Sequence, residues 1–265
     1  VVNEDRDRGE GDRAPEDAPG HGSTLATVLK AVLFDWGGTL MSDEWSDEIA
    51  LEGHTAGLNA LARDGLPDAA KFTRYLREHE AELFPLASED EIDIAAVMAG
   101  SFREHGAQLT DDDVRLFLQA AQDVWSSYYV LADSTHALLE ALRARGLKLA
   151  LVSNTASPQW LLQSILERQG IAERVDTIVL SSEVGKRKPH PAIFERALRE
   201  LGVDSSEALF VGDRLEADVL GASRVGMKTV QAVWFRADEG PQGVEADYQA
   251  FTQMDVLNVA DRLAT

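Results

Sequence analysis

The feature that most constrains this chain is a repeated alternation of apolar runs and helical segments after residue 133. Apolar runs at 147–152, 175–180, 208–211 and 229–233 predict strands, and the amphipathic segments between them, with a last one at 252–264, predict helices. A further apolar run, 27–36, comes early in the chain and stops at Gly37. Strands that alternate with helices form a parallel sheet with helices on both faces. The sequence therefore predicts an α/β fold with a Rossmann-like doubly wound parallel sheet.

The stretch between the first two predicted strands is helical. Four segments, 42–65, 67–84, 88–106 and 109–130, carry apolar residues at i, i+3 and i+4 spacing and begin near Ser, Asp or Thr capping signals. This pattern predicts an all-α cap domain over 44–131, inserted between the two parts of a core, 26–43 and 132–265. Residues 1–25 are acidic, rich in Gly and Pro and free of aromatic side chains, which predicts a disordered tail.

Composition narrows the classes of function. The formal charge is −21, so the surface repels phosphate backbones, and neither nucleic acid nor an anionic membrane is expected as a partner. The absence of cysteine excludes disulfides, thiolate metal sites and cysteine nucleophiles. Apolar runs stay well short of the ~20 residues that a membrane span needs, and a cytoplasmic location is expected. The oligomeric state is left open.

Polar residues gather after four of the predicted strands. In chain order these residues are Asp35, Ser153 with Asn154, Lys188, and the pair Asp213 and Asp218. Any one of these groups alone equally suits a helix cap or a solvated charge, and solvation is the expected state of Lys186 and Arg187. Carboxyl ends of parallel strands meet at one edge of a sheet, where ligands bind in open α/β folds. The ordered set therefore predicts a functional site at that edge.

This ordered set resembles the motifs of the haloacid dehalogenase superfamily of hydrolases, most of which are phosphatases. The resemblance covers 27–235 and includes the helical cap inserted after the first motif. It implies that Asp35 is the nucleophile, that an aspartyl-phosphate forms on it, and that the substrate is a small phosphorylated metabolite. Lys188 would hold Asp35 ionised and stabilise charge on the transferring group.

The resemblance also implies a cofactor and a phosphate site. Mg²⁺ is the expected cation, since it prefers oxygen ligands and acts as a Lewis acid. The implied metal ligands are Asp35, the carbonyl of Gly37, Asp213 and Asp218. The implied phosphate ligands are Ser153, the amide of Asn154, Lys188 and backbone N–H groups around Gly38 and Thr39.

One position departs from the family pattern. Phosphatases of this family carry a second Asp two residues after the nucleophile, as general acid and base, and this chain has Gly37 there. General acid–base catalysis contributes about 10²–10⁴-fold, so weak or atypical phosphatase activity is expected. One alternative is a catalytically impaired protein that binds metal and phosphate. Another is a phosphonatase-like C–P hydrolase that uses Lys71, the cap's lysine. Trp45 suits either packing or closure over substrate.

Overall fold

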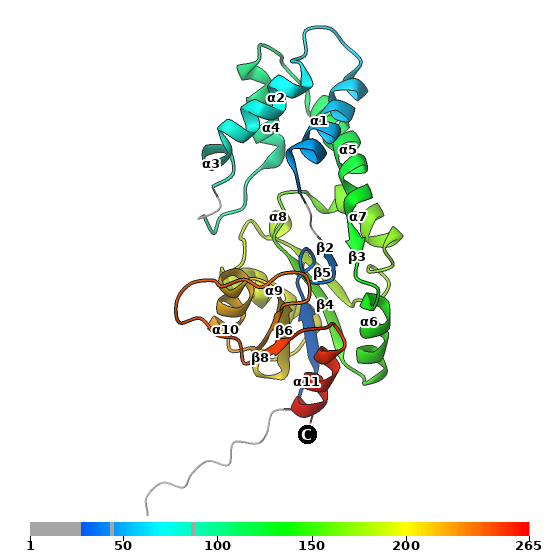
Figure 1. Cartoon of the computed structure of the whole chain (residues 1–265), viewed down its shortest axis with the longest axis vertical. Coiled ribbons are helices and arrows are strands. Elements are labelled where there is room, and N and C mark those ends of the chain that lie inside the picture. Colours follow the sequence, from blue (N-terminus) through cyan, green and yellow to red (C-terminus); the bar gives the residue numbers. More distant parts are fainter. Residues whose placement is uncertain (1–27, 43–44, 86–87, 265) are drawn as a thin grey trace, which may run out of the picture.

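The computed structural model describes residues 28–42, 45–85 and 88–264 (Figure 1). The predicted tail, 1–25, lies outside these residues. Six strands form a parallel sheet in the order β5-β4-β1-β6-β7-β8. The strands are β1 (Ala31–Phe34), β4 (Lys148–Ser153), β5 (Thr177–Leu180), β6 (Ala208–Gly212), β7 (Lys228–Ala232) and β8 (Tyr248–Ala250). The prediction of a doubly wound parallel sheet is confirmed.

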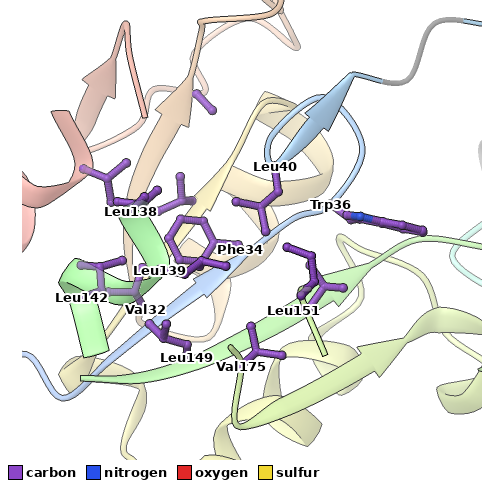
Figure 2. Close-up of a cluster of buried hydrophobic side chains, with 14 of the residues drawn as sticks. Val32, Phe34, Trp36, Leu40, Leu138, Leu139, Leu142, Leu149, Leu151 and Val175 are labelled. Carbon is purple, nitrogen blue, oxygen red and sulfur yellow. The ribbon is translucent and has the colours of Figure 1, made fainter. Parts of the chain in front are cut away.

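Strand β1 lies at the centre of the sheet because both of its faces are apolar. Val32 and Phe34 belong to one buried cluster, which Figure 2 shows together with Leu138 and Leu149. Ala31 and Leu33 face a second cluster on the other side. Packing on both faces holds the strand in place, and this sets the position of Asp35, the residue that follows it.

Helices cover both faces of the sheet. The first cluster takes its side chains from α6 (Thr135–Ala144), α7 (Gln159–Arg168) and α11 (Asp255–Leu263). The second takes them from α9 (Pro191–Leu201) and α10 (Gly221–Arg224). Short helical turns, α8 (Ser181–Val184) and η3 (Leu215–Leu220), follow β5 and β6 directly. Of these two turns, η3 carries a predicted site residue, Asp218.

A group of helices lies between the paired crossings β2 (Met41–Ser42) and β3 (Val130–Leu131), which form an antiparallel ladder. These helices are α1 (Asp47–Leu61), α2 (Ala69–Glu78), α3 (Glu80–Leu83), α4 (Ile94–Glu104) and α5 (Asp111–Trp125). They enclose a core of their own in which Phe72, Phe102 and Phe117 are fully buried. Figure 1 shows this helical cap beyond the end of the sheet.

Several elements differ from the predictions. The helix predicted over 88–106 forms only over Ile94–Glu104, and residues 89–91 before it pair with residues 185–187 instead. The strand predicted at 27–36 spans Ala31–Phe34 among the described residues, and beyond its carboxyl end the N–H of Trp36 donates to Oδ1 of Asp35 at 2.8 Å and not to a neighbouring strand. The helix predicted over 67–84 divides at His79, which has a non-helical backbone, into α2 and α3. The edge strand β8 was not predicted, since three residues carry too little periodicity. Within the described ranges, no helix is long and apolar enough to cross a membrane.

Candidate active site

Three carboxylates meet at the carboxyl edge of the sheet. Asp35 follows β1, Asp213 follows the neighbouring strand β6, and Asp218 lies in η3. Each offers a carboxylate oxygen within 4.8 Å of the other two. Asp213 and Asp218 are completely buried. Asp218 approaches the backbone of Gly212 so closely that a Cβ there would lie 2.4 Å from its carboxylate, so glycine is required.

The amine of Lys188 lies between two of these carboxylates. Its Nζ is 2.7 Å from Oδ1 of Asp35 and 2.7 Å from Oδ1 of Asp218, and it donates a hydrogen bond to the carbonyl of Val152 at 3.0 Å. Burial raises the pKa of Asp35 to about 7, even though Lys188 opposes the rise. Burial alone would lower the pKa of Lys188, but the charges of Asp218 and Asp35 outweigh it and hold the pKa above the ordinary value. The lysine is therefore an ammonium ion at neutral pH.

Asp213 has one oxygen bound and one oxygen without a partner. Its Oδ2 accepts from Nε of Arg236 at 2.5 Å, whereas its Oδ1 has no hydrogen-bond partner among the described residues. Oδ1 of Asp218 is ion-paired with Lys188 but likewise lacks an aligned hydrogen bond. Buried carboxylate oxygens without donors are costly unless a cation reaches them. An all-oxygen set of three carboxylates fits a hard divalent cation such as Mg²⁺.

The turn after Asp35 is shaped by Gly38. Its φ is +75°, and a Cβ there would lie 2.7 Å from both Oδ2 of Asp213 and Nη2 of Arg236. The N–H of Gly38 donates to the carbonyl of Met41 at 2.8 Å, and that of Thr39 donates to the carbonyl of Trp36 at 3.3 Å. Both N–H groups that the sequence analysis assigned to phosphate are thus engaged inside the turn, which reverses the chain toward β2. Their role toward phosphate stays a prediction.

Ser153 and Asn154 lie where predicted, at the end of β4, and line the same cavity as Asp35. The side chain of Asn154 binds the backbone of Lys188 twice. Its Nδ2 donates to the carbonyl at 2.9 Å, and its Oδ1 accepts from the N–H at 2.7 Å. The carboxamide therefore ties the loop after β4 to the loop that carries the lysine. Because both polar atoms of this side chain are engaged, residue 154 would contact phosphate through its backbone N–H.

A family model for haloacid dehalogenase-like hydrolases matches residues 29–226. The chain belongs to this family. It is 33% identical over 205 residues to a glyceraldehyde 3-phosphate phosphatase of Methanopyrus kandleri, an alignment that covers 77% of this chain and 84% of that protein. It is 30% identical over 221 residues to a phosphoglycolate phosphatase of Xanthomonas campestris, covering 82% and 90%.

Solved structures give the same fold. A haloacid dehalogenase-like phosphatase from Thermococcus onnurineus superposes with a TM-score of 0.60 at 25% identity and covers 87% of this chain and 97% of its own. A 2-haloacid dehalogenase from Pseudomonas syringae superposes with a TM-score of 0.64 at 22% identity, covering 89% and 99%, which shows the fold alone. The chain is a hydrolase of this family, of the phosphatase type.

The site of this haloacid dehalogenase-like hydrolase opens into a cavity of about 760 Å³. The core contributes Asp35, Gly37, Ser153 and Lys188, and the helical cap contributes Trp45, Ser88 and Glu89. The ring of Trp45 lies edge-on to that of Trp125 at 5.3 Å, and its side chain remains largely exposed. Trp45 thus both packs within the cap and faces the cavity.

Three arginines that the sequence analysis did not select also line this cavity, namely Arg187, Arg214 and Arg236. Arg187 was expected to be solvated, yet its side chain is only 19% exposed, whereas Lys186 does pair with Asp90 at the surface. Arg236 follows β7, a strand that was not predicted to contribute to the site. A basic residue four positions after a buried strand was the signal available there.

Proposed function

We propose that this protein transfers the phosphoryl group of a small phosphorylated metabolite to Asp35 and then to water, with Mg²⁺ as cofactor. One observation carries the proposal: the carboxylate of Asp35 is held 2.7 Å from the amine of Lys188 inside a cluster of three carboxylates at the cavity wall. The two curated relatives, named as phosphatases of glyceraldehyde 3-phosphate and phosphoglycolate, support a small substrate.

The residues of the site would have separate roles in this reaction. Asp35, Asp213, Asp218 and the carbonyl of Gly37 would hold the cation, which neutralises phosphate charge and acts as a Lewis acid. An oxygen of Asp35 attacks phosphorus, the bond from phosphorus to the ester oxygen breaks, and the alkoxide leaves. Water then attacks the aspartyl-phosphate and releases inorganic phosphate. Lys188 opposes the rise in the pKa of Asp35, which favours the ionised nucleophile, and offers a positive charge to the transferring group.

Gly37 shapes the choice of substrate. The leaving alkoxide needs a proton, and the related phosphatases supply it from an Asp at this position. Without that acid, turnover favours leaving groups that are stable as anions, as in acyl and aryl phosphates. Ordinary sugar phosphates are expected to react slowly.

The geometry bears on only one of two alternative functions. A protein that binds metal and phosphate without turnover would use the same cluster, and only kinetics separates it from an enzyme. A phosphonatase-like reaction would need Lys71 at the cavity. Lys71 lies exposed on α2 and is not among the described residues that line the cavity, so this alternative has no structural support.

The test is hydrolysis of para-nitrophenyl phosphate and acetyl phosphate in Mg²⁺ and in EDTA. We expect turnover that requires Mg²⁺ and is lost in Asp35→Asn, while the exposed Asp64→Asn, a change of the same chemistry outside the site, behaves as the wild type. Gly37→Asp should raise phosphomonoesterase activity by at least about tenfold. Gly37 is not among the glycines with a positive φ, so its backbone conformation is one that a residue with a side chain adopts readily. A wild type without turnover, or an active Asp35→Asn, contradicts the proposal.

A further inference from the structure

A short segment of the helical cap pairs with the loop that carries Lys188. Residues 89–91, which connect α3 to α4, lie antiparallel to residues 185–187, with Asp90 opposite Lys186. The N–H of Glu91 donates to the carbonyl of Gly185 at 3.1 Å, and the N–H of Arg187 donates to the carbonyl of Glu89 at 2.8 Å. Figure 1 shows this segment of the cap reaching the region of α8. The pairing ends one residue before the buried lysine.

The side chain of Glu91 enters the core at this point. It is 3% exposed, and Oε2 accepts a hydrogen bond from the hydroxyl of Ser181 while lying 3.8 Å from Nε of Arg187. Oε1 accepts from the N–H of Ile92 at 2.9 Å. A carboxylate is buried at a large cost unless it is hydrogen-bonded and near a cation. Glu91 meets both conditions only while the cap segment is docked on the core.

Ser181 passes this contact on to the loop after β4. Its completely buried Oγ accepts from the N–H of Thr155 at 2.7 Å and lies 3.2 Å from the carbonyl of Thr155. A hydroxyl has one proton to donate, and the carboxylate of Glu91 is the stronger acceptor. The proton therefore points to Glu91, and the oxygen lone pair holds the N–H of Thr155, two residues after Ser153.

We propose that Glu91 is a positioning residue that couples docking of the cap to the geometry of the phosphate site. It is tied through Ser181 to the loop of Ser153 and Asn154, and through its backbone to the loop of Lys188. Asn154 already joins those two loops. The cap segment, the loop of Ser153 and Asn154 and the loop of Lys188 are thus each joined to the other two. None of these joining contacts involves the three carboxylates assigned to the cation. This inference rests on the proposed function for the identity of the phosphate site.

The nearby acidic residues make suitable controls. Asp90 pairs with Lys186, but its side chain is 71% exposed, and Glu89 is paired with Arg224 at 3.7 Å near the surface. Exposed ion pairs contribute little to stability. Asp90→Asn removes a charge from the same segment and keeps the backbone pairing, so it separates the buried contact of Glu91 from the mere presence of an acidic segment.

The experiment measures binding of inorganic phosphate to the Mg²⁺-loaded protein, and of Mg²⁺ to the metal-free protein, by calorimetry. For Glu91→Ala we expect phosphate affinity to fall by about tenfold or more, the usual consequence of losing a hydrogen bond to a charged group, with Mg²⁺ affinity within about twofold of wild type. Glu91→Gln keeps an acceptor for Ser181 and should recover most of the phosphate affinity. Asp90→Asn should match the wild type.

The outcomes separate this inference from the proposed function. Equal losses of phosphate and Mg²⁺ affinity in Glu91→Ala would show a general structural defect and overturn the inference, as would unchanged phosphate affinity. Should Glu91→Ala fail to fold, Ser181→Ala removes the connecting hydroxyl alone, and wild-type phosphate binding by that variant overturns the inference. A wild type that binds phosphate without turnover contradicts the proposed function and leaves the positioning role standing.

Discussion

Replacing Gly38 with alanine tests whether the turn after Asp35 and the metal-ligand cluster are packed as one unit. A methyl group at Gly38 would lie 2.7 Å from Oδ2 of Asp213 and 2.7 Å from Nη2 of Arg236. Arg236 is partly exposed and can move, whereas Asp213 is completely buried. The substitution must therefore shift the carboxylate, the turn or both.

The chain contains a matched control for the backbone component. Gly65 has φ of +81°, close to the +75° of Gly38, but a Cβ there would meet nothing within 4 Å. The left-handed conformation costs an alanine about 1 kcal/mol, so Gly65→Ala should lower the free energy of unfolding by about that amount. Overpacking adds about 1–3 kcal/mol, so Gly38→Ala should lower it by about 2–4 kcal/mol.

Metal affinity gives the second readout. Disturbing the groups that orient a metal ligand costs about 10- to 100-fold in affinity, so Gly38→Ala should weaken Mg²⁺ binding to that extent while Gly65→Ala leaves it unchanged. Urea unfolding and calorimetric titration of the metal-free protein measure the two effects. Equal destabilisation of both variants, or wild-type Mg²⁺ affinity in Gly38→Ala, would refute the claim that the glycine makes room for Asp213.

Other predictions concern charge at the site and in the cap. Lys188→Met removes the cation beside Asp35 and should reduce phosphate hydrolysis by about 10²–10³-fold in a protein of native circular dichroism; activity near wild type would remove the lysine from the mechanism. Arg236→Gln leaves Asp213 without its ionic partner and should weaken Mg²⁺ binding by about tenfold, measured by calorimetry, and unchanged affinity would show that Asp213 is held by packing alone. Burial in the cap lowers the pKa of His54 to about 4 from 6.5, so protonation favours the unfolded chain. The contribution of neutral His54 to the free energy of unfolding is fully present above pH 6.5 and is lost as the pH falls, by about 2 kcal/mol from pH 8 to pH 5. The difference in free energy of unfolding between the wild type and His54→Phe, measured in urea, should therefore shrink by that amount between the two pH values.

The parts of the fold that could be predicted are those where local pattern and topology agree. Central parallel strands are buried on both faces, so β1 and β4 are continuous apolar runs in the sequence. Their ends mark Asp35 and Ser153, and the sheet brings these ends together. Lys188 follows the same logic, because the loop after β5 returns along the same edge.

Other parts depend on contacts that no local pattern encodes. Glu91 lies in the segment 88–106, which was predicted to be helical, whereas the helix begins only at Ile94 and the contact of the cap with α8 buries the Glu91 side chain. Arg236 gains its role from a contact with Asp213 across the sheet edge. The engagement of the Gly38 N–H inside its own turn likewise depends on the path that the chain takes toward β2. Periodicity predicts which face of an element is buried, and it does not predict which loops meet.

The cluster of three buried carboxylates destabilises the folded protein locally, and interactions elsewhere in the molecule must offset this cost in free energy. Asp213 and Asp218 are completely buried and Asp35 nearly so, and Lys188 is a buried cation beside Asp35 and Asp218. The apolar clusters on both faces of β1 and β6 hold the strand ends in place, so the backbone keeps these like charges together despite their repulsion. A ligand that binds only the folded chain stabilises it in proportion to its affinity. We therefore expect a divalent cation to attract all three carboxylates and to offset their mutual repulsion, so that the repulsion present in the metal-free protein adds to the affinity for the cation.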